Sequence, residues 1–391
     1  MTIKFRQILL VALVLLTSKL SAQTLSTDAV ISILTFGPGK TELYSAYGHS
    51  AIRVHDPAKG FDAAYNYGTF DFNQPNFYLN FTRGNLIYKL AVQDAKLLTA
   101  YYQTNDRSIT EQVLNLSIEQ KQAVFAYLQN NAKAENAGYK YDYFYDNCAT
   151  RIGLVFVEAL GDEFRYDDSF VDEPGLTVRE LTDRYSAKAF PWGKLGIDIC
   201  LGMPMDKTLT NIQYTYIPEY VFKAFSLAQV NQNGQWLPIV STTNYTYVAR
   251  QEKSKGPFFT PNLVFWSFFL VVLVISVLAK RRNISLRWFD LVFFMLTGIL
   301  GLLLFLLWVA TDHAAAAWNL NLLWAWPTHL IIAFSLTKKL KPRWLNRYLQ
   351  FTAILAIALV VLWPLIPQVL NPALIPIVLT IATRAIATIF D

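Results

Sequence analysis

Five long apolar runs in the C-terminal third of this 391-residue chain constrain its fold more than any other feature. About 20 apolar residues, each rising 1.5 Å in a helix, cross the roughly 30 Å hydrocarbon core of a bilayer. The runs are 263–279, 291–310, 318–337, 348–363 and 373–390, of which the first and fourth are shorter and rely on flanking aromatic residues. We therefore expect an all-α polytopic membrane domain with about five helices over residues 259–391.

The distribution of charge predicts the orientation of these spans. Residues 259–391 contain ten Lys and Arg against three acidic residues, concentrated in the loops 280–287 and 338–347. Residues 1–258 contain 24 basic and 25 acidic residues. Short basic loops face the cytoplasm, so residues 23–258 should lie outside. The net charge of +6 then reflects membrane topology and gives no reason to expect a nucleic-acid partner.

The N-terminus has the layout of a secretory signal peptide over residues 1–22. Two basic residues precede the apolar stretch Ile8–Leu16, and small residues end at Ala22. Leu20 is larger than the residue usually found three positions before a cleavage site, so an uncleaved membrane anchor is the alternative.

The region between signal peptide and spans reads as one α+β domain, 23–258. "AVISILTFG" and "YGHSAIRVHD" are apolar, β-branched runs that end in turn residues, as strands do. Residues 48–72 read as a hairpin with "DPAKG" as its turn. A helix-like segment is expected from Leu90, and a second helix starts with Ser117 and Gln120 at capping-box spacing.

One of the two cysteines lies where a helix is expected to begin. Asp146 and Asn147 are residue types that cap helix N-termini, and Cys148 follows them at the start of an apolar periodic run that ends at Gly161. The positive end of the helix dipole favours a thiolate over a thiol in the first turn. Cys148 is therefore a candidate nucleophile.

A nucleophilic thiol needs a base that takes its proton. Of the four histidines, two fall in the membrane region, and His55 lies beside the Asp56-Pro57 turn. His49 is expected in mid-strand, where a catalytic base would be held in place, although a strand histidine is more often structural. A disulfide between Cys148 and Cys200 is the other alternative, because exported domains meet an oxidising compartment.

The segments "YGHSAIRVHD", "AYNYGTFDFNQPNFYLNFTRGNLIYKL" and "YDYFYDNCATRI" resemble the outer domain of the Lnb family, bacterial lipoprotein N-acyltransferases of the Bacteroides type. The resemblance extends into the membrane region through "DHAAAAWNLNLLWAWPTHL". The family's outer domain is similar to circularly permuted papain-like enzymes, a group shared with NlpC-like peptidases and lecithin–retinol-type acyltransferases. The resemblance therefore implies an extracytoplasmic, permuted papain-like domain in a multi-pass protein of the bacterial inner membrane.

The resemblance also implies roles for individual residues. His49 would be the base, Cys148 the nucleophile and Asn147 its neighbour in the motif. Asn66, on the strand expected to pair with that of His49, is our choice for the residue that orients the imidazole, although it could equally serve the sheet or the turn. Either Tyr145 or a backbone N–H near Cys148 could stabilise an oxyanion.

Polar residues at the outer ends of the second and third apolar runs form a second candidate site, namely Asp312, His313, Asn319 and Asn321. Ionisable and amide groups in spans are costly and often functional, so these residues could dock the lipid substrate. The alternative is an outer loop at the water level, with nearby tryptophans forming an interfacial belt.

The resemblance implies transfer of an acyl chain from a membrane phospholipid, through a Cys148 thioester, to the α-amine of a diacylglyceryl-modified lipoprotein. Two alternatives remain, a membrane-anchored cell-wall cysteine amidase or peptidase and a non-enzymatic envelope-binding module. Five spans exceed what an anchor requires, which favours the acyltransferase. No metal-binding or nucleotide-binding motif is visible, so no cofactor is expected.

Overall fold

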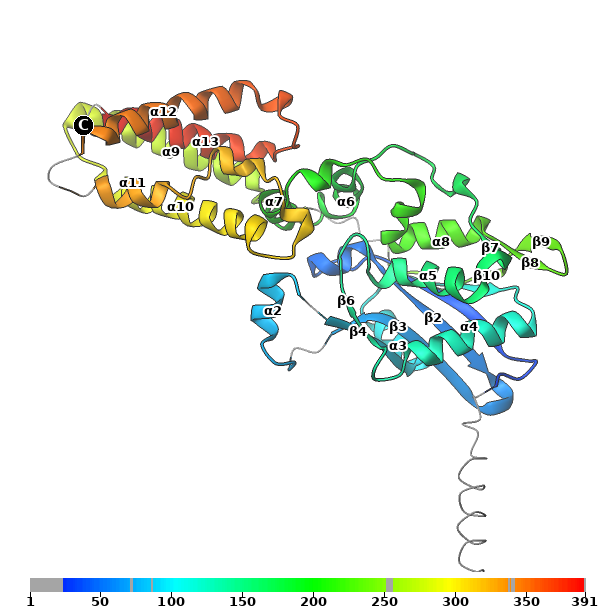
Figure 1. The fold of residues 1–391 in the computed structure, drawn as a ribbon. Coiled ribbons are helices and arrows are strands. Elements are labelled where there is room, and N and C mark those ends of the chain that lie inside the picture. Colours follow the sequence, from blue (N-terminus) through cyan, green and yellow to red (C-terminus); the bar gives the residue numbers. More distant parts are fainter. Residues whose placement is uncertain are drawn as a thin grey trace, which may run out of the picture.

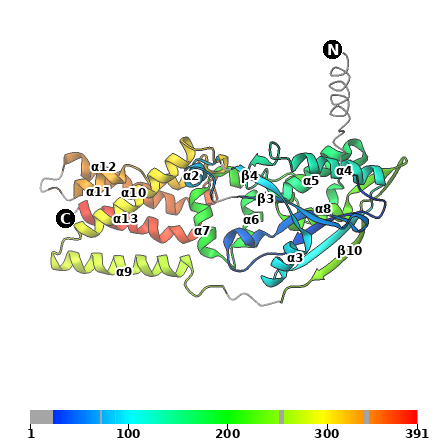
Figure 2. The same ribbon diagram turned by 90° about the horizontal axis from the view of Figure 1, so that it is seen from below.

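The computed structural model describes residues 24–70, 73–85, 87–250, 256–336, 338 and 342–389. A domain built on a twisted sheet is followed by a helical bundle, and the two lie end to end (Figures 1 and 2). This arrangement confirms the predicted fold class of an α+β domain followed by an all-α membrane domain. The predicted signal peptide lies outside the described residues.

A seven-stranded sheet with the order β10-β5-β1-β2-β3-β4-β6 forms the centre of the first domain, and its neighbouring strands are antiparallel. The strands are β1 Val30–Phe36, β2 His49–Asp56, β3 Phe61–Thr69, β4 Ile87–Asp94, β5 Ile109–Leu114, β6 Gly138–Lys140 and β10 Val240–Tyr247. The predicted hairpin is confirmed as β2 and β3, joined by the turn Pro57–Lys59. The helix expected from Leu90 begins later, at Ala95, because the Asp94 side chain caps it and Leu90 belongs to β4.

Helices cover both faces of this sheet. One face packs against α4, α5 and α8 in the largest core cluster, and the other packs against α3. The expected capping box at Ser117 and Gln120 is formed. The helices are α3 Ala95–Thr104, α4 Ile118–Asn131, α5 Cys148–Leu160 and α8 Pro218–Leu227, and a small second sheet contains β7 Phe164–Arg165, β8 Gln229–Gln232 and β9 Gln235–Pro238.

Among the described residues, four helices are long and apolar enough to cross a membrane. They are α9 Pro261–Arg282, α10 Arg287–Val309, α12 Arg343–Val361 and α13 Ile375–Ile389, the last preceded by the turn Pro372–Leu374. Basic residues end α9 and begin α10 and α12, at the end of the bundle remote from the sheet (Figure 1). Their position agrees with a cytoplasmic location for that end.

The expected third span does not form a continuous helix. In the described part of the run, residues 318–336, only α11, His329–Leu336, is α-helical, and it has eight residues. The preceding segment forms the 3-10 turn Leu320–Leu323, and Asn319 and Asn321 are buried with side chains bonded to backbone carbonyls of another helix. Non-helical backbone is tolerated at membrane depth where protein surrounds it. Hydropathy therefore predicted the crossing but not its conformation.

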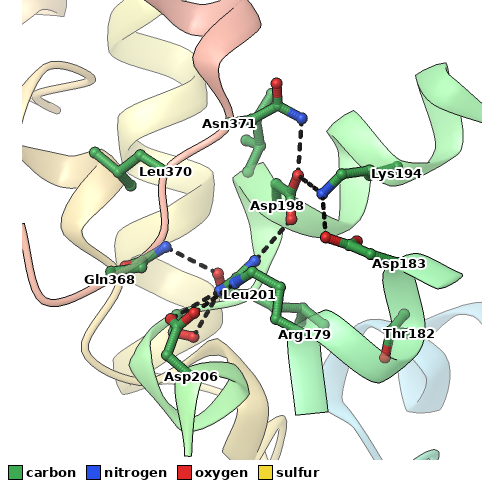
Figure 3. A network of polar contacts seen from close by, with 12 residues as sticks. Arg179, Thr182, Asp183, Lys194, Asp198, Leu201, Asp206, Gln368, Leu370 and Asn371 are labelled. Atoms are coloured by element: carbon green, nitrogen blue, oxygen red, sulfur yellow. Dashed lines mark hydrogen bonds and ion pairs between the residues drawn. The ribbon is translucent and has the colours of Figure 1, made fainter. Parts of the chain in front are cut away.

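A buried polar network joins the domain to the bundle (Figure 3). At its centre, Asp198 of α7 (Pro191–Cys200) accepts from Arg179 of α6 (Val178–Ser186) at 2.7 Å, and from Lys194 and Asn371 at 2.7 Å each. Arg179 also donates to Asp206 at 2.8 Å. Asn371 belongs to the segment that leads into α13, so the network ties α6 and α7 of the first domain to the spans.

Candidate active site

Cys148 is the first residue of α5, as expected, and Asn147 fixes its position. The Asn147 side-chain oxygen accepts from the backbone N–H groups of Ala149 and Thr150 at 2.8 and 3.0 Å. Its amide nitrogen donates to the backbone oxygens of Tyr143 and Tyr216, each at 2.8 Å. Every hydrogen-bonding group of this buried side chain therefore holds the start of the helix in place, which positions the thiol.

The structure brings His49, Asn66 and Cys148 together from three elements. His49 is the first residue of β2 rather than a mid-strand residue, because Gly48, at φ +87°, turns the chain into the strand. His49 Nε2 donates to the Asn66 side-chain oxygen at 2.6 Å. The imidazole also hydrogen-bonds the Cys148 thiol, and since Asn66 occupies Nε2, the Nδ1 nitrogen is left for the sulfur.

The electrostatics of the pair favour a thiolate next to an imidazolium. Burial raises the pKa of Cys148, but the charge of His49 and its hydrogen bond outweigh burial, so the pKa ends below its ordinary value. Burial lowers the pKa of His49, yet the charge and hydrogen bond of Cys148, together with Asn66, bring it above its ordinary value. The arrangement can supply a thiolate nucleophile and a proton donor from one site.

Two backbone N–H groups point at the sulfur, those of Ser50 and of Cys148 itself, and both help to lower the thiol pKa. A backbone N–H near Cys148 was expected at this helix start, whereas that of Ser50 was not predicted. Ser50 follows His49 on β2, so the same strand supplies the imidazole and a hydrogen-bond donor. The position of Ser50 depends on strand placement, which no local sequence signal reveals.

Gly68 is another part of the site that sequence reasoning missed. It adopts φ +83°, and a Cβ atom at this position would lie 3.1 Å from the Cβ of Cys148. A Cβ this close would push the Cys148 side chain by a few tenths of an ångström, and the positive φ itself favours glycine. The glycine lies in the quoted motif "AYNYGTFDF", so its position in a strand could have signalled a close approach.

Three further residues support the position of His49, either through Asn66 or through the aromatic stack on the imidazole ring. Gln93 accepts from the Asn66 amide nitrogen at 2.9 Å, which fixes the orientation of that amide. Tyr102 stacks on the His49 ring with 6.1 Å between ring centres, and the Arg107 guanidinium lies 4.6 Å from the Tyr102 ring centre. These residues act through His49 and Asn66.

A cavity of about 510 Å³ lies between the outer domain and the outer ends of the spans. Its lining includes Tyr44, Phe81, Tyr141, Ile197, Asp312 and His313. Tyr141, one residue of this lining, packs against the same core cluster as Cys148, and burial and, next, the charge of Cys148 raise the pKa of Tyr141. The cavity is large enough for part of a lipid and mostly apolar in its lining.

The four residues of the second candidate site divide into two groups. Asp312 and His313 line the cavity, and Asp312 accepts from Lys140 at 2.8 Å, which lowers the Asp312 pKa. Asn319 and Asn321 lie apart from them and bind backbone oxygens at the end of α7, at 2.8 and 2.9 Å. The proposed membrane-side dock is therefore brought together only in part.

Two alternatives from the sequence concern Tyr145 and the disulfide. The Tyr145 side chain is 48% exposed, and its backbone N–H donates to Asp142 rather than pointing toward the thiol. Cys148 and Cys200 are both free thiols, so the predicted alternative of a disulfide between them is wrong.

In the described part of the chain, no group of three or more His, Cys, Asp or Glu side chains could hold a metal ion.

Comparison with known families is consistent with this geometry. The model for the Lnb N-terminal periplasmic domain matches residues 17–184, which include His49, Asn66 and Cys148. The model for the Lnb transmembrane domain, described as having five transmembrane helices, matches residues 251–391. The chain belongs to the Lnb family.

This Lnb-family chain is thus a multi-pass membrane protein with a periplasmic domain. The fifth helix in the family description corresponds to the run that contains short α11, since the other four are long. No curated protein and no solved structure is similar enough to this chain to match it.

Proposed function

We propose that this Lnb-family protein is a lipoprotein N-acyltransferase of the bacterial inner membrane, with Cys148 as its nucleophile. The Cys148 thiolate attacks the ester carbonyl of a phospholipid acyl chain, and the imidazolium of His49 gives its proton to the departing lysophospholipid oxygen. A thioester forms as the ester bond breaks.

In the second half-reaction, the free α-amine of a diacylglyceryl-cysteine lipoprotein attacks that thioester. Neutral His49 takes the proton lost by the amine, the amide bond forms, and the C–S bond breaks to regenerate the Cys148 thiolate. A thiol suits both steps because it is at once a good nucleophile and a good leaving group. The N–H of Cys148, at a helix N-terminus, is the preferred donor to the oxyanion of each tetrahedral intermediate.

One observation carries the proposal: Tyr141, which packs against the same core as Cys148 of the His49–Cys148 pair, lines a cavity that the outer ends of the spans also help to line. Both substrates of the proposed reaction are held in a bilayer, and a site at this level reaches ester bonds near the membrane surface. The cell-wall amidase alternative keeps the same pair of residues but gives no role to the membrane side of the cavity.

The test is expression in a strain depleted of its own lipoprotein N-acyltransferase, followed by mass spectrometry of a lipoprotein N-terminal peptide. We expect an amide-linked acyl chain with the unaltered protein and with Cys200→Ala. Cys148→Ser and His49→Ala should leave a free amine at normal protein levels. A free amine in cells that contain the correctly inserted, unaltered protein would refute the proposal.

A further inference from the structure

The short helix α2, Phe77–Arg83, extends from the sheet edge to the outer end of the bundle (Figures 1 and 2). The backbone N–H of Asp312 donates to the Arg83 oxygen at 2.8 Å, and His313 Nε2 donates to the Phe81 oxygen at 3.1 Å. A Cβ at Gly84 would lie 2.9 Å from the backbone nitrogen of His313. The end of α2 is therefore fixed to the loop that follows α10.

That loop marks the outer interface of the bilayer. It lies between Trp308 and Trp318, whose rings are 5.0 Å apart, and Trp318 is 63% exposed. Tryptophans gather at the membrane–water interface, where an amphipathic ring contacts both phases. Because residues 312 and 313 lie between them in the chain, α2 is held at the same depth.

At this depth α2 exposes apolar side chains. Tyr78 is 80% exposed, Leu79 52% and Phe81 53%, whereas Phe77 is buried against the domain. Such a surface is costly in water and suits lipid, as does the outer end of α10, where Val309 is 55% exposed. A lipid surface is therefore the partner that this face fits.

The same helix borders the cavity. Phe81 and Gly84 line it, as does Tyr44, which is 70% exposed. α2 thus stands between the lipid-facing surface of the bundle and the space next to Tyr141.

We propose that α2 lies in the outer leaflet and forms the lateral opening through which a phospholipid acyl chain reaches the cavity. Contact with the bilayer is independent of the reaction, whereas passage of the acyl donor rests on the proposed function. Tyr78 and Leu79 contact lipid, and Phe81 lies where the chain turns into the cavity.

Membrane depth can be measured without any catalysis. A nitroxide is attached to Tyr78→Cys in a full-length Cys148→Ser, Cys200→Ser background, reconstituted in vesicles of phosphatidylethanolamine and phosphatidylglycerol. Tyr245→Cys, on β10, is the matched control, since Tyr245 is 70% exposed. We expect the label at 78 to collide preferentially with oxygen and that at 245 with a water-soluble nickel chelate. Equal, water-like accessibility at both positions would overturn the proposal.

The acyl-donor role is tested with Tyr78→Ser/Leu79→Ser against Tyr245→Ser/Val248→Ser, which removes a similar pair of exposed side chains. We expect acylation of the protein from vesicle phospholipid to slow about tenfold or more in the first pair only, because its membrane contact is lost. The defect should shrink when the phospholipid is supplied in detergent micelles. Equal rates for the two pairs would overturn the donor role, whereas no acylation by the unaltered protein would refute the proposed function and leave the depth result standing.

Discussion

At the scale of single residues, the imidazole of His49 is held by three neighbours that act in different ways. Asn66 accepts its Nε2 proton, Tyr102 stacks on its face, and Cys148 shares a proton with its remaining nitrogen. Asn66 and Tyr102 set the position of the ring, whereas the charge of Cys148 and its hydrogen bond do most to raise the pKa of His49, with a smaller contribution from Asn66. Reactivity and geometry can therefore be tested by different changes.

The first prediction concerns the pH dependence of thiol reactivity. The His49 charge lowers the Cys148 pKa, whereas burial raises that of Cys200. Alkylation by iodoacetamide, followed on the separate peptides by mass spectrometry, should persist for Cys148 at pH values where Cys200 no longer reacts. His49→Ala should shift the Cys148 profile to higher pH. Identical profiles for the two cysteines would contradict the ion pair.

The second prediction concerns the side-chain amides of Asn66 and Gln93, which hold the His49 ring in position. Asn66→Ala should lower the acyl-transfer rate about ten- to hundredfold, or roughly 1.4–2.7 kcal/mol, because the ring loses a charge-assisted hydrogen bond. Gln93→Ala should act in the same direction but less strongly, since Gln93 bonds the Asn66 amide and reaches the ring through it. Gln129→Ala is the control, because it removes a 2.6 Å hydrogen bond to Tyr65 rather than one near His49. Equal rates in all three variants would exclude a positioning role for Asn66.

At the scale of elements, features encoded locally were predictable. The Asn147 cap, the Ser117–Gln120 capping box and the β2–β3 hairpin each depend on residues a few positions apart. The proximity of Asn66 to His49 followed from that hairpin. Contacts between distant elements were not predictable, as Gly68 against Cys148 illustrates. Hydropathy likewise located the third crossing but could not show that buried Asn321 would bond to α7 instead of allowing a continuous helix.

The third prediction tests the close approach of β3 to α5. Gly68→Ala should reduce alkylation and acyl transfer strongly, because the new methyl group would press on Cys148. Gly60→Ala is a matched control: Gly60 also has positive φ, +63°, but its Cβ would meet nothing within 4 Å. Each change adds backbone strain of about 1–2 kcal/mol. Comparable loss of activity in both variants would show that strain alone, rather than contact with the thiol, is responsible.

At the scale of the whole molecule, the position of the site relative to the membrane depends on the network around Asp198. Leu195 of the same helix is buried in the core of the bundle, so α7 belongs structurally to both parts. Asp198 forms ion pairs with both Arg179 and Lys194 and accepts from Asn371 (Figure 3). The outer domain is thus anchored by buried charge as well as by covalent connection.

The fourth prediction is that Asp198→Asn weakens this junction. Removing one partner of a buried ion pair costs about 3–5 kcal/mol, because the other charge stays desolvated. The thermal midpoint of the protein in detergent should fall by roughly 5–10 °C. Glu173→Gln, at an exposed ion pair with Arg184, should cost less than about 1 kcal/mol. Similar midpoints for the two variants would contradict an anchoring role for Asp198.

The central claim is that Cys148 carries an acyl chain taken from a phospholipid. The most direct measurement is mass spectrometry of the full-length protein after incubation with phospholipid vesicles and no lipoprotein acceptor. We predict the added mass of one acyl chain on the Cys148 peptide, released by neutral hydroxylamine and absent from Cys148→Ser. An unmodified Cys148 peptide, or an acyl chain found on Cys200 instead, would contradict it.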